Sequence, residues 1–236
     1  MTNKTAYDIC VIGAGSGGLS VAAAAASFGQ KVVLIEKGAM GGDCLNTGCV
    51  PSKSLLAAGK HAHALTTGEA FGIAVCKPDI DFAKVNDHVK EVIASIAPFD
   101  SVERFESLGV KVITAAGAFV DRQTVQAGGE TIRARRFVIA TGSSPAAPPV
   151  PGLDDVDYLT NETIFELRRK PEKLIIIGGG PIGMEMAQAH CRLGCKVTVL
   201  EAFDPLGKDD PEHTSIVLGR TRPATPTCSP ASTWAT

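Results

Sequence analysis

Alternating apolar and polar stretches divide the start of the chain into a strand, a turn, a helix and a second strand. The short, β-branched run at residues 7–12 is typical of a buried parallel strand. A glycine-rich turn follows at once, and the alanine-rich residues 19–28 predict a helix that ends at Gly29. Residues 31–35 predict the second strand, which leads directly into Glu36.

The same order of elements returns in the last third of the chain. Residues 173–177 and 196–200 are apolar runs that predict two more strands. Residues 184–193 lie between them and predict a helix, which is followed by Gly194. This internal repeat predicts an α/β fold made of two Rossmann-like dinucleotide-binding units.

Each copy carries a G-x-G-x-x-G turn before its helix and an acidic residue after its second strand. Glu36 follows Gly13 by 23 residues, and Glu201 follows Gly178 by the same 23 residues. One such turn is a weak signal, but two copies in the same context with an acid at the same offset are a strong one. The alternative is a pair of glycine-rich turns in an unrelated α/β fold. The turn glycines are Gly13, Gly15 and Gly18 in the first copy and Gly178, Gly180 and Gly183 in the second.

The residue types of this motif have a shared physical purpose. The first glycine permits a tight turn, the second lets a pyrophosphate approach the backbone, and the third lets the helix lie close to the strand. The free N–H groups and the positive dipole end of the helix favour phosphates. The carboxylates of Glu36 and Glu201 can accept hydrogen bonds from ribose hydroxyls.

The stretch between the two copies holds lesser elements and a linker. Helices are predicted at residues 51–65 and 82–107, the second interrupted near Pro98. The basic run at residues 133–136 is interpreted as a solvated turn, and the proline-rich residues 143–152 as the linker between two domains. Short strands are predicted at residues 110–113, 117–120, 124–126, 131–134 and 137–142.

Composition and charge are those of a globular protein. Of the 236 residues, 44% are hydrophobic and 20% charged, so the chain can bury a sizeable core. The net charge of −2 argues against nucleic acid or an anionic membrane as a partner. No run approaches the roughly 20 apolar residues of a membrane span, and the first residues do not form a secretion signal. We therefore expect a cytoplasmic protein.

Two cysteines, Cys44 and Cys49, lie five residues apart in the segment GGDCLNTGCVPSK, which directly follows the first copy. The attacking species in thiol chemistry is the thiolate. Cys49 precedes a predicted helix, and the positive end of that helix together with Lys53 favours a thiolate there. This arrangement predicts electron transfer between a flavin and a disulfide.

Two other uses of the cysteine pair are weaker. Two ordinary loop cysteines would leave the surrounding glycines, proline and lysine without a common explanation. A zinc site needs four ligands, but His61 and His63 lie well along the next helix and no second cysteine pair has ligand spacing. No metal site is therefore predicted.

In this order, the first turn, the cysteine segment and the second turn resemble the pyridine nucleotide–disulfide oxidoreductases. The chain is most similar to the class that contains dihydrolipoamide dehydrogenase, mercuric reductase and glutathione reductase. The resemblance covers roughly residues 6–219, and residues 41–53 are its most specific part. It implies FAD in the first unit and a nicotinamide nucleotide in the second. Electrons would pass between the nicotinamide, the flavin, the Cys44–Cys49 disulfide and a substrate.

The resemblance also implies residue roles. Cys49 is then the thiol next to the flavin, and Cys44 is the interchange thiol that faces the substrate. Lys53 lies near the flavin N5 and is ion-paired to Glu185 on the helix of the second turn, so these four residues are the implied catalytic group. Besides the glycines and acids of the two turns, the implied cofactor-binding residues are Lys37, Gly42, Lys53, Gly117, Thr141 and Gly142.

The choice of nucleotide and substrate depends on fewer residues. Glu201 stands where an NADP-binding member usually offers arginines, which favours NAD and so favours a function like that of dihydrolipoamide dehydrogenase. A mercuric reductase-like enzyme is the alternative, so the substrate is a small disulfide, a dithiol or a metal ion. Asp43 stands where threonine is usual, and its carboxylate is expected to disfavour the thiolate of Cys44.

Full members of the family are longer, so a C-terminal part is expected to be missing. That part completes the nicotinamide domain and adds a dimer-interface domain with a His–Glu acid–base pair, which His213 does not replace. A frameshift or premature stop is the preferred explanation. The expected domains are an FAD-binding domain with the redox disulfide at residues 1–146, an incomplete NAD(P)-binding domain at 147–220 and a disordered tail at 221–236.

Two further hypotheses remain at this point. The chain could be a non-catalytic remnant that at most binds a dinucleotide. It could also be a small enzyme similar to thioredoxin reductase, which is disfavoured because the second unit has no C-x-x-C sequence.

Overall fold

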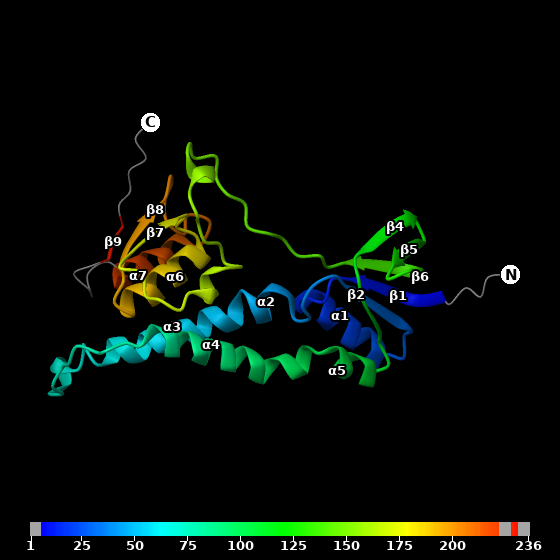
Figure 1. Ribbon diagram of the computed structural model, residues 1–236, viewed down its shortest axis with the longest axis horizontal. Helices are drawn as coiled ribbons and strands as arrows, with labels where there is room; N and C mark the ends of the chain where they lie inside the picture. Colours follow the sequence, from blue (N-terminus) through cyan, green and yellow to red (C-terminus); the bar gives the residue numbers. More distant parts are fainter. Residues whose placement is uncertain (1–5, 222–227, 231–236) are drawn as a thin grey trace. The chain divides into compact units, whose positions relative to one another are not determined.

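A computed structural model describes residues 6–221 and 228–230 of the chain (Figure 1). The chain forms two compact units, and two helices run across the boundaries between them. Residues 52–90 are part of the second unit, although the sequence places them in the first domain. The first unit comprises Met1–Pro51 and Glu91–Glu162, and the second comprises Ser52–Lys90 and Thr163–Thr236.

The first unit is built on a six-stranded sheet with the order β3-β2-β1-β6-β5-β4. The pairs from β3 to β6 are parallel, and β5 and β4 continue the sheet in antiparallel fashion. The strands are β1 Ala6–Ile12, β2 Val32–Glu36, β3 Lys111–Thr114, β4 Gly117–Asp121, β5 Thr124–Ala127 and β6 Glu130–Ile139. The helical segments are α1 Ser16–Ser27, α2 Gly42–Asn46, η2 Ala97–Asp100, α5 Val102–Ser107 and η3 Leu153–Asp155.

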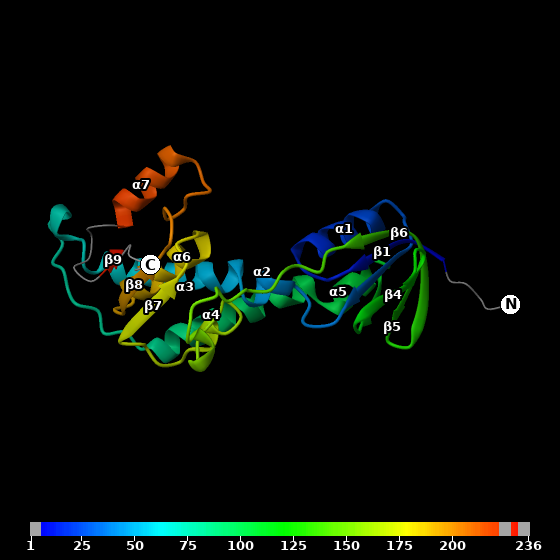
Figure 2. The same cartoon turned by 90° about the horizontal axis from the view of Figure 1, so that it is seen from above.

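Both faces of this sheet are covered, as its apolar strands require. On one face, Leu19 of α1 and Phe105 of α5 pack on Leu34 of β2. On the other face, Cys10 and other residues of the parallel strands pack against Val125 from the antiparallel half of the same sheet. Figure 2 shows α1 on one side of β1 and the β4–β5 hairpin on the other. The sheet thus supplies part of its own cover.

Strand β6 corrects two sequence predictions. The sequence predicts two separate strands and a solvated turn at residues 133–136, but Glu130–Ile139 is one strand of ten residues. Its first half pairs with β5 and its second half with β1 in continuous register. The arginines lie within the strand, where Arg135 forms an ion pair with Asp8 at 3.3 Å. Pairing first with β5 and then with β1 therefore holds the basic residues in a strand that their polarity alone does not predict.

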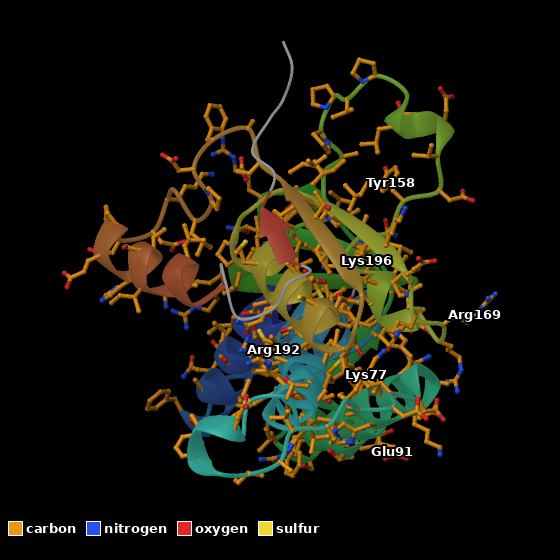
Figure 3. The ribbon with its side chains drawn as sticks, turned by 90° about the vertical axis from the view of Figure 1, so that its left-hand side faces the viewer. Lys77, Glu91, Tyr158, Arg169, Arg192 and Lys196 are labelled. Carbon is orange, nitrogen blue, oxygen red and sulfur yellow. The ribbon has the colours of Figure 1, made fainter. Side chains whose placement is uncertain are left out.

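The second unit contains a three-stranded parallel sheet with the order β7-β8-β9. Ala187 and Cys191 of the helix between β7 and β8 pack on Val197 to form its core. Figure 3 labels Arg192 at the end of this helix and Lys196 at the start of β8. The strands are β7 Lys173–Ile177, β8 Lys196–Leu200 and β9 Cys228–Pro230. The helices are α3 Cys49–Ala64, η1 Glu69–Phe71, α4 Phe82–Ile96, η4 Ile164–Glu166, α6 Pro181–Arg192 and α7 Pro211–Thr221, of which α3 begins and α4 ends in the first unit.

The predicted disordered tail at residues 221–236 is described only in part. Thr221 ends α7, and Cys228–Pro230 is a short strand paired with β8, so at these residues the structure differs from the prediction. The edge of β8 offers backbone hydrogen-bond partners to residues 228–230, and the composition of the tail does not predict this pairing. Residues 222–227 and 231–236 lie outside the described part of the chain. No helix within the described residues is long and apolar enough to cross a membrane.

Candidate functional site

The first glycine turn is shaped by close backbone contacts. Gly13 has φ +104°, and a Cβ built there would lie 2.1 Å from the carbonyl oxygen of Ala140. A Cβ at Gly18 would lie 1.8 Å from the carbonyl oxygen of Gly13. Helix α1 then begins with Gly15 as its N-cap, without a side-chain cap and without an acidic residue in the first turn. Its N-terminal N–H groups are therefore available to an anion.

The second glycine turn repeats this geometry with more space around it. Gly178 has φ +109°, and a Cβ placed on it would meet no atom of the described residues within 4 Å; the same is true of Gly180. A Cβ at Gly183 would lie 2.1 Å from the oxygen of Gly178. Helix α6 has Gly180 as its N-cap, Pro181 in the first turn, no side-chain cap and no acid in the first turn. Both turns thus fit a pyrophosphate by the same means.

The acids after the two turns make equivalent hydrogen bonds. Glu36 accepts from the N–H of Ala14 at 2.5 Å and from that of Gly38 at 2.7 Å. Glu201 accepts from the N–H of Gly179 at 2.6 Å and from that of Phe203 at 3.1 Å. The bonds from Gly179 and Phe203 lower the pKa of Glu201 below its usual value. An ionised carboxylate has about four acceptor positions, so each keeps room for ribose hydroxyls.

The cysteine segment is fixed against the first glycine turn. The N–H of Gly41 donates to the carbonyl oxygen of Ala14 at 2.9 Å, and Gly41 has φ +88°. A Cβ at Gly42 would lie 2.6 Å from the Cα of Gly15. Only glycine fits such an approach of two backbones. These contacts place α2, which carries Cys44, next to the first glycine turn in space.

Cys44 and Cys49 both carry reduced thiols, and their side chains are hydrogen-bonded to each other. The hydrogen bond with Cys49 raises the pKa of Cys44 above its ordinary value, and burial and the charge of Asp100 add to the rise. Cys44 therefore keeps its proton at pH values where an ordinary thiol begins to lose it. The charge of Asp100 is the smallest of these causes and Asp43 is not among them, so the effect of Asp43 on this thiolate stays a prediction.

The residues after β6 meet the same turn from the other side. The N–H of Ala140 donates to the carbonyl oxygen of Ile12 at 2.8 Å, which sets residues 140–142 beside Gly13. Gly142 has φ +68°, and a Cβ on it would lie 3.9 Å from Oδ2 of Asp43. The structure therefore brings Thr141 and Gly142 to the first turn.

Two other implied cofactor residues lie at strand ends in the first unit. Gly117, at the start of β4, approaches β2, where a Cβ would lie 3.3 Å from Cγ2 of Ile35. Lys37 is exposed directly after β2.

The predicted ion pair between Lys53 and Glu185 is present. Nζ of Lys53 lies 2.7 Å from Oε1 of Glu185, and the two side chains are 62% and 34% exposed. The other carboxylate oxygen, Oε2, accepts a hydrogen bond from the buried hydroxyl of Ser52 at 2.8 Å. Further along, a Cβ at Gly59 would lie 3.2 Å from the oxygen of Ala189. Helix α3, which begins at Cys49, is thus held against α6 at two levels.

Sequence reasoning missed Ser52, Asp100 and Phe203. Ser52 stands inside the recognised cysteine segment, and its proximity to the predicted Lys53–Glu185 pair was the available signal. Asp100 is distant in sequence from Cys44, so only the fold relates them. Among the described residues, no group of three or more His, Cys, Asp or Glu side chains could hold a metal ion.

The sequence of residues 7–222 matches the family model for pyridine nucleotide-disulphide oxidoreductases. This chain belongs to that family. Within it, the chain is 39% identical over 212 residues to a mercuric reductase of Bacillus cereus, covering 89% of this chain and 34% of the relative. It is 36% identical over 214 residues to the chloroplastic dihydrolipoyl dehydrogenase 2 of Arabidopsis thaliana, covering 89% and 38% respectively.

A solved structure with a related sequence has the same fold. The HOCl-induced flavoprotein disulfide reductase RclA from Escherichia coli matches with a TM-score of 0.79 and 25% identity, covering 96% of this chain and 49% of that protein. The chain thus spans between about a third and a half of the length of these three proteins. The matched residues include both glycine turns and the cysteine segment between them.

Proposed function

We propose that this chain is the nucleotide-binding and dithiol-bearing part of an FAD- and NAD(P)-dependent disulfide oxidoreductase, most like dihydrolipoamide dehydrogenase. The observation that carries the proposal is the hydrogen-bonded pair of Cys44 and Cys49. Both belong to the unit in which the cysteine segment is bonded to the first glycine turn. A thiol pair is thereby built onto a dinucleotide site.

In this proposal the first unit holds FAD. The open N–H groups of α1 bind the pyrophosphate at Gly13, Gly15 and Gly18, and Glu36 accepts from the adenosine ribose. Thr141 and Gly142 close over the nucleotide from the end of β6. Bound FAD supplies two-electron exchange between a nicotinamide and a thiol pair. The protein supplies position and electrostatics.

The two thiols have different roles in the proposal. When the Cys44–Cys49 disulfide forms, the two thiols together lose two protons and two electrons. Cys49, the first residue of α3, is the thiol next to the flavin. Cys44 retains its proton and exchanges with the substrate after a base removes that proton.

The second unit binds the nicotinamide nucleotide, and we propose NAD over NADP. Backbone N–H groups lower the pKa of Glu201, which favours its ionised form. A 2′-phosphate beside this carboxylate would meet like charge, whereas ribose hydroxyls can donate to it. The same unit contains the ion pair between Lys53 of α3 and Glu185 of α6.

A second candidate function is the reduction of mercuric ion. It is favoured by the relatives named mercuric reductase, of which the Bacillus cereus protein is 39% identical to this chain. In that reaction the metal ion is the substrate and gains two electrons. Cytoplasmic location and a homodimer completed by a further domain remain predictions from the sequence.

The test is to purify the chain, saturate it with FAD and remove free flavin. The expected result is a yellow protein whose flavin absorbance falls on addition of NADH, more readily than with NADPH. Cys49→Ser and Cys44→Ser should retain flavin but no longer transfer electrons to a disulfide. Mercuric ion in place of the disulfide separates the two candidates. A protein that stays colourless after FAD saturation contradicts the proposal and supports a non-catalytic remnant.

A further inference from the structure

The loop after β8 is tied to the second glycine turn at two points. The N–H of Gly179 donates to Oε2 of Glu201 at 2.6 Å, and the carbonyl oxygen of Gly179 accepts from the N–H of Leu206 at 2.9 Å. Leu206 adopts φ +55°, the only positive φ of a non-glycine residue among those described. The loop between Glu201 and Leu206 is thus held at both ends by one residue of the turn.

Phe203 lies between these two anchors and points its ring into solvent. It is 85% exposed, which leaves a full aromatic surface in water beside a nucleotide turn. Its own N–H donates to Oε1 of Glu201 at 3.1 Å, so its backbone is fixed by the same carboxylate. An exposed aromatic ring on a hydrogen-bonded backbone is suited to stack on another flat ring.

The first copy shows that this ring is not needed to build the loop. There Gly38 occupies the equivalent position and makes the equivalent hydrogen bond to Glu36 at 2.7 Å. The anchor five residues after the acid is also equivalent, because Gly41 donates to Ala14 at 2.9 Å. The same hydrogen bonds form without a side chain at this position. The phenyl ring of Phe203 is therefore an addition of the second copy.

We propose that Phe203 binds the adenine of the nicotinamide dinucleotide by stacking. The inference rests on the proposed function, in which Glu201 accepts from the ribose that bears this adenine. The base is attached to that ribose, and the aromatic residue closest to Glu201 in sequence is Phe203, two positions on. Stacking of a base on an aromatic side chain strengthens binding, and alanine substitution removes that contribution. Phe203 is a binding residue of the second site and takes no part in electron transfer.

The test uses the full chain and two probes. ADP-ribose carries the adenine, whereas nicotinamide mononucleotide lacks it. Phe203→Ala is expected to weaken ADP-ribose binding about tenfold, which corresponds to about 1.4 kcal/mol, and to leave nicotinamide mononucleotide binding unchanged. Phe203→Trp should restore the affinity and Phe203→Leu should not, because leucine offers apolar surface without a ring. The ethenoadenine analogue of ADP-ribose should lose fluorescence on binding to wild type but not to Phe203→Leu.

Phe71 supplies the matched control, because it is an 83% exposed phenylalanine in the same unit. Phe71→Ala is expected to bind both probes like wild type. If wild type binds ADP-ribose and Phe203→Ala binds it equally well, stacking is overturned while the proposed nucleotide site stands. If wild type binds no ADP-ribose, the proposed site fails and this inference fails with it.

Discussion

The two copies of the strand–turn–helix–strand unit share one hydrogen-bond frame and differ in what is attached to it. In each copy the acid accepts from the second residue of the glycine turn and from the residue two positions beyond itself. In each copy the residue five positions after the acid, Gly41 or Leu206, is left-handed and donates back to the turn. The frame therefore suits a nucleotide backbone in general.

The differences lie in the space that surrounds the two turns. In the first copy the cysteine segment lies against Gly15, and the end of β6 lies against Gly13. In the second copy Gly178 and Gly180 have no such neighbours among the described residues. Among the described residues, the first turn is thus built into a crowded site with a thiol pair, while the second has free space around the first two glycines of its motif. The two copies therefore share their hydrogen bonds, and the thiol pair is attached to the first copy.

The largest expected effect is a difference between equivalent glycines. Gly178→Ala meets no atom in the described part of the chain but must hold a positive φ, which costs about 1–2 kcal/mol. Gly13→Ala pays the same cost and also drives a Cβ into the oxygen of Ala140, so roughly 3–5 kcal/mol is expected. Urea unfolding of each variant measures the free energies, and flavin retention should fall only for Gly13→Ala. Equal losses would show that crowding does not distinguish the copies.

A smaller effect is expected where the helix after the first copy meets the helix of the second. Ser52→Ala removes a buried hydroxyl that donates to the Glu185 carboxylate, and about 1–2 kcal/mol of unfolding free energy should be lost. Lys53→Met removes the ion pair with Glu185, but the side chain of Lys53 is 62% exposed. Such exposed ion pairs contribute about 0–1 kcal/mol to the free energy of unfolding. A greater loss in Lys53→Met than in Ser52→Ala would contradict this ranking. The double variant measures the coupling between the two partners.

The thiol pair gives a comparison of rates without a change in stability. Asp100 raises the pKa of Cys44, so Asp100→Asn should make Cys44 react faster with iodoacetamide near pH 8. Asp43→Asn is the matched control and should leave the rate unchanged. Cys49→Ala removes the largest cause of the raised pKa and should accelerate Cys44 most. Mass spectrometry of the modified peptides assigns the rate to each cysteine, and a faster Asp43→Asn variant would restore the original expectation from the sequence.

The sequence predicted the repeated frame because the frame is local. Strand periodicity, the glycine turns and the acid at a fixed offset all lie within a span of some two dozen residues of each copy. The family motif also implied the Lys53–Glu185 pair, which is present. The misses are long-range: β6 is continuous because two strands pair with it, and Asp100 reaches Cys44 only through the fold. Such contacts depend on tertiary packing and leave no pattern along the chain.

The smallest expected effect concerns pH and again compares the two acids. N–H donors lower the pKa of Glu201 in the folded state. The stability that its ionised carboxylate contributes is therefore fully present above the unfolded-state pKa of about 4.3. That stability is lost as the pH falls through the lower folded-state pKa. Glu201→Gln should therefore reduce the loss of unfolding free energy that occurs as the pH falls below about 4.3. Glu36→Gln is the matched variant in the first copy, with two equivalent donors. Urea midpoints from about pH 3 to pH 7 measure how the stability of each variant changes with pH. If this change is the same in Glu201→Gln as in wild type, the hydrogen bonds from Gly179 and Phe203 do not favour the ionised carboxylate. In that case the carboxylate would also be a poorer basis for selecting NAD, because its charge, and not only its shape, is what disfavours a 2′-phosphate.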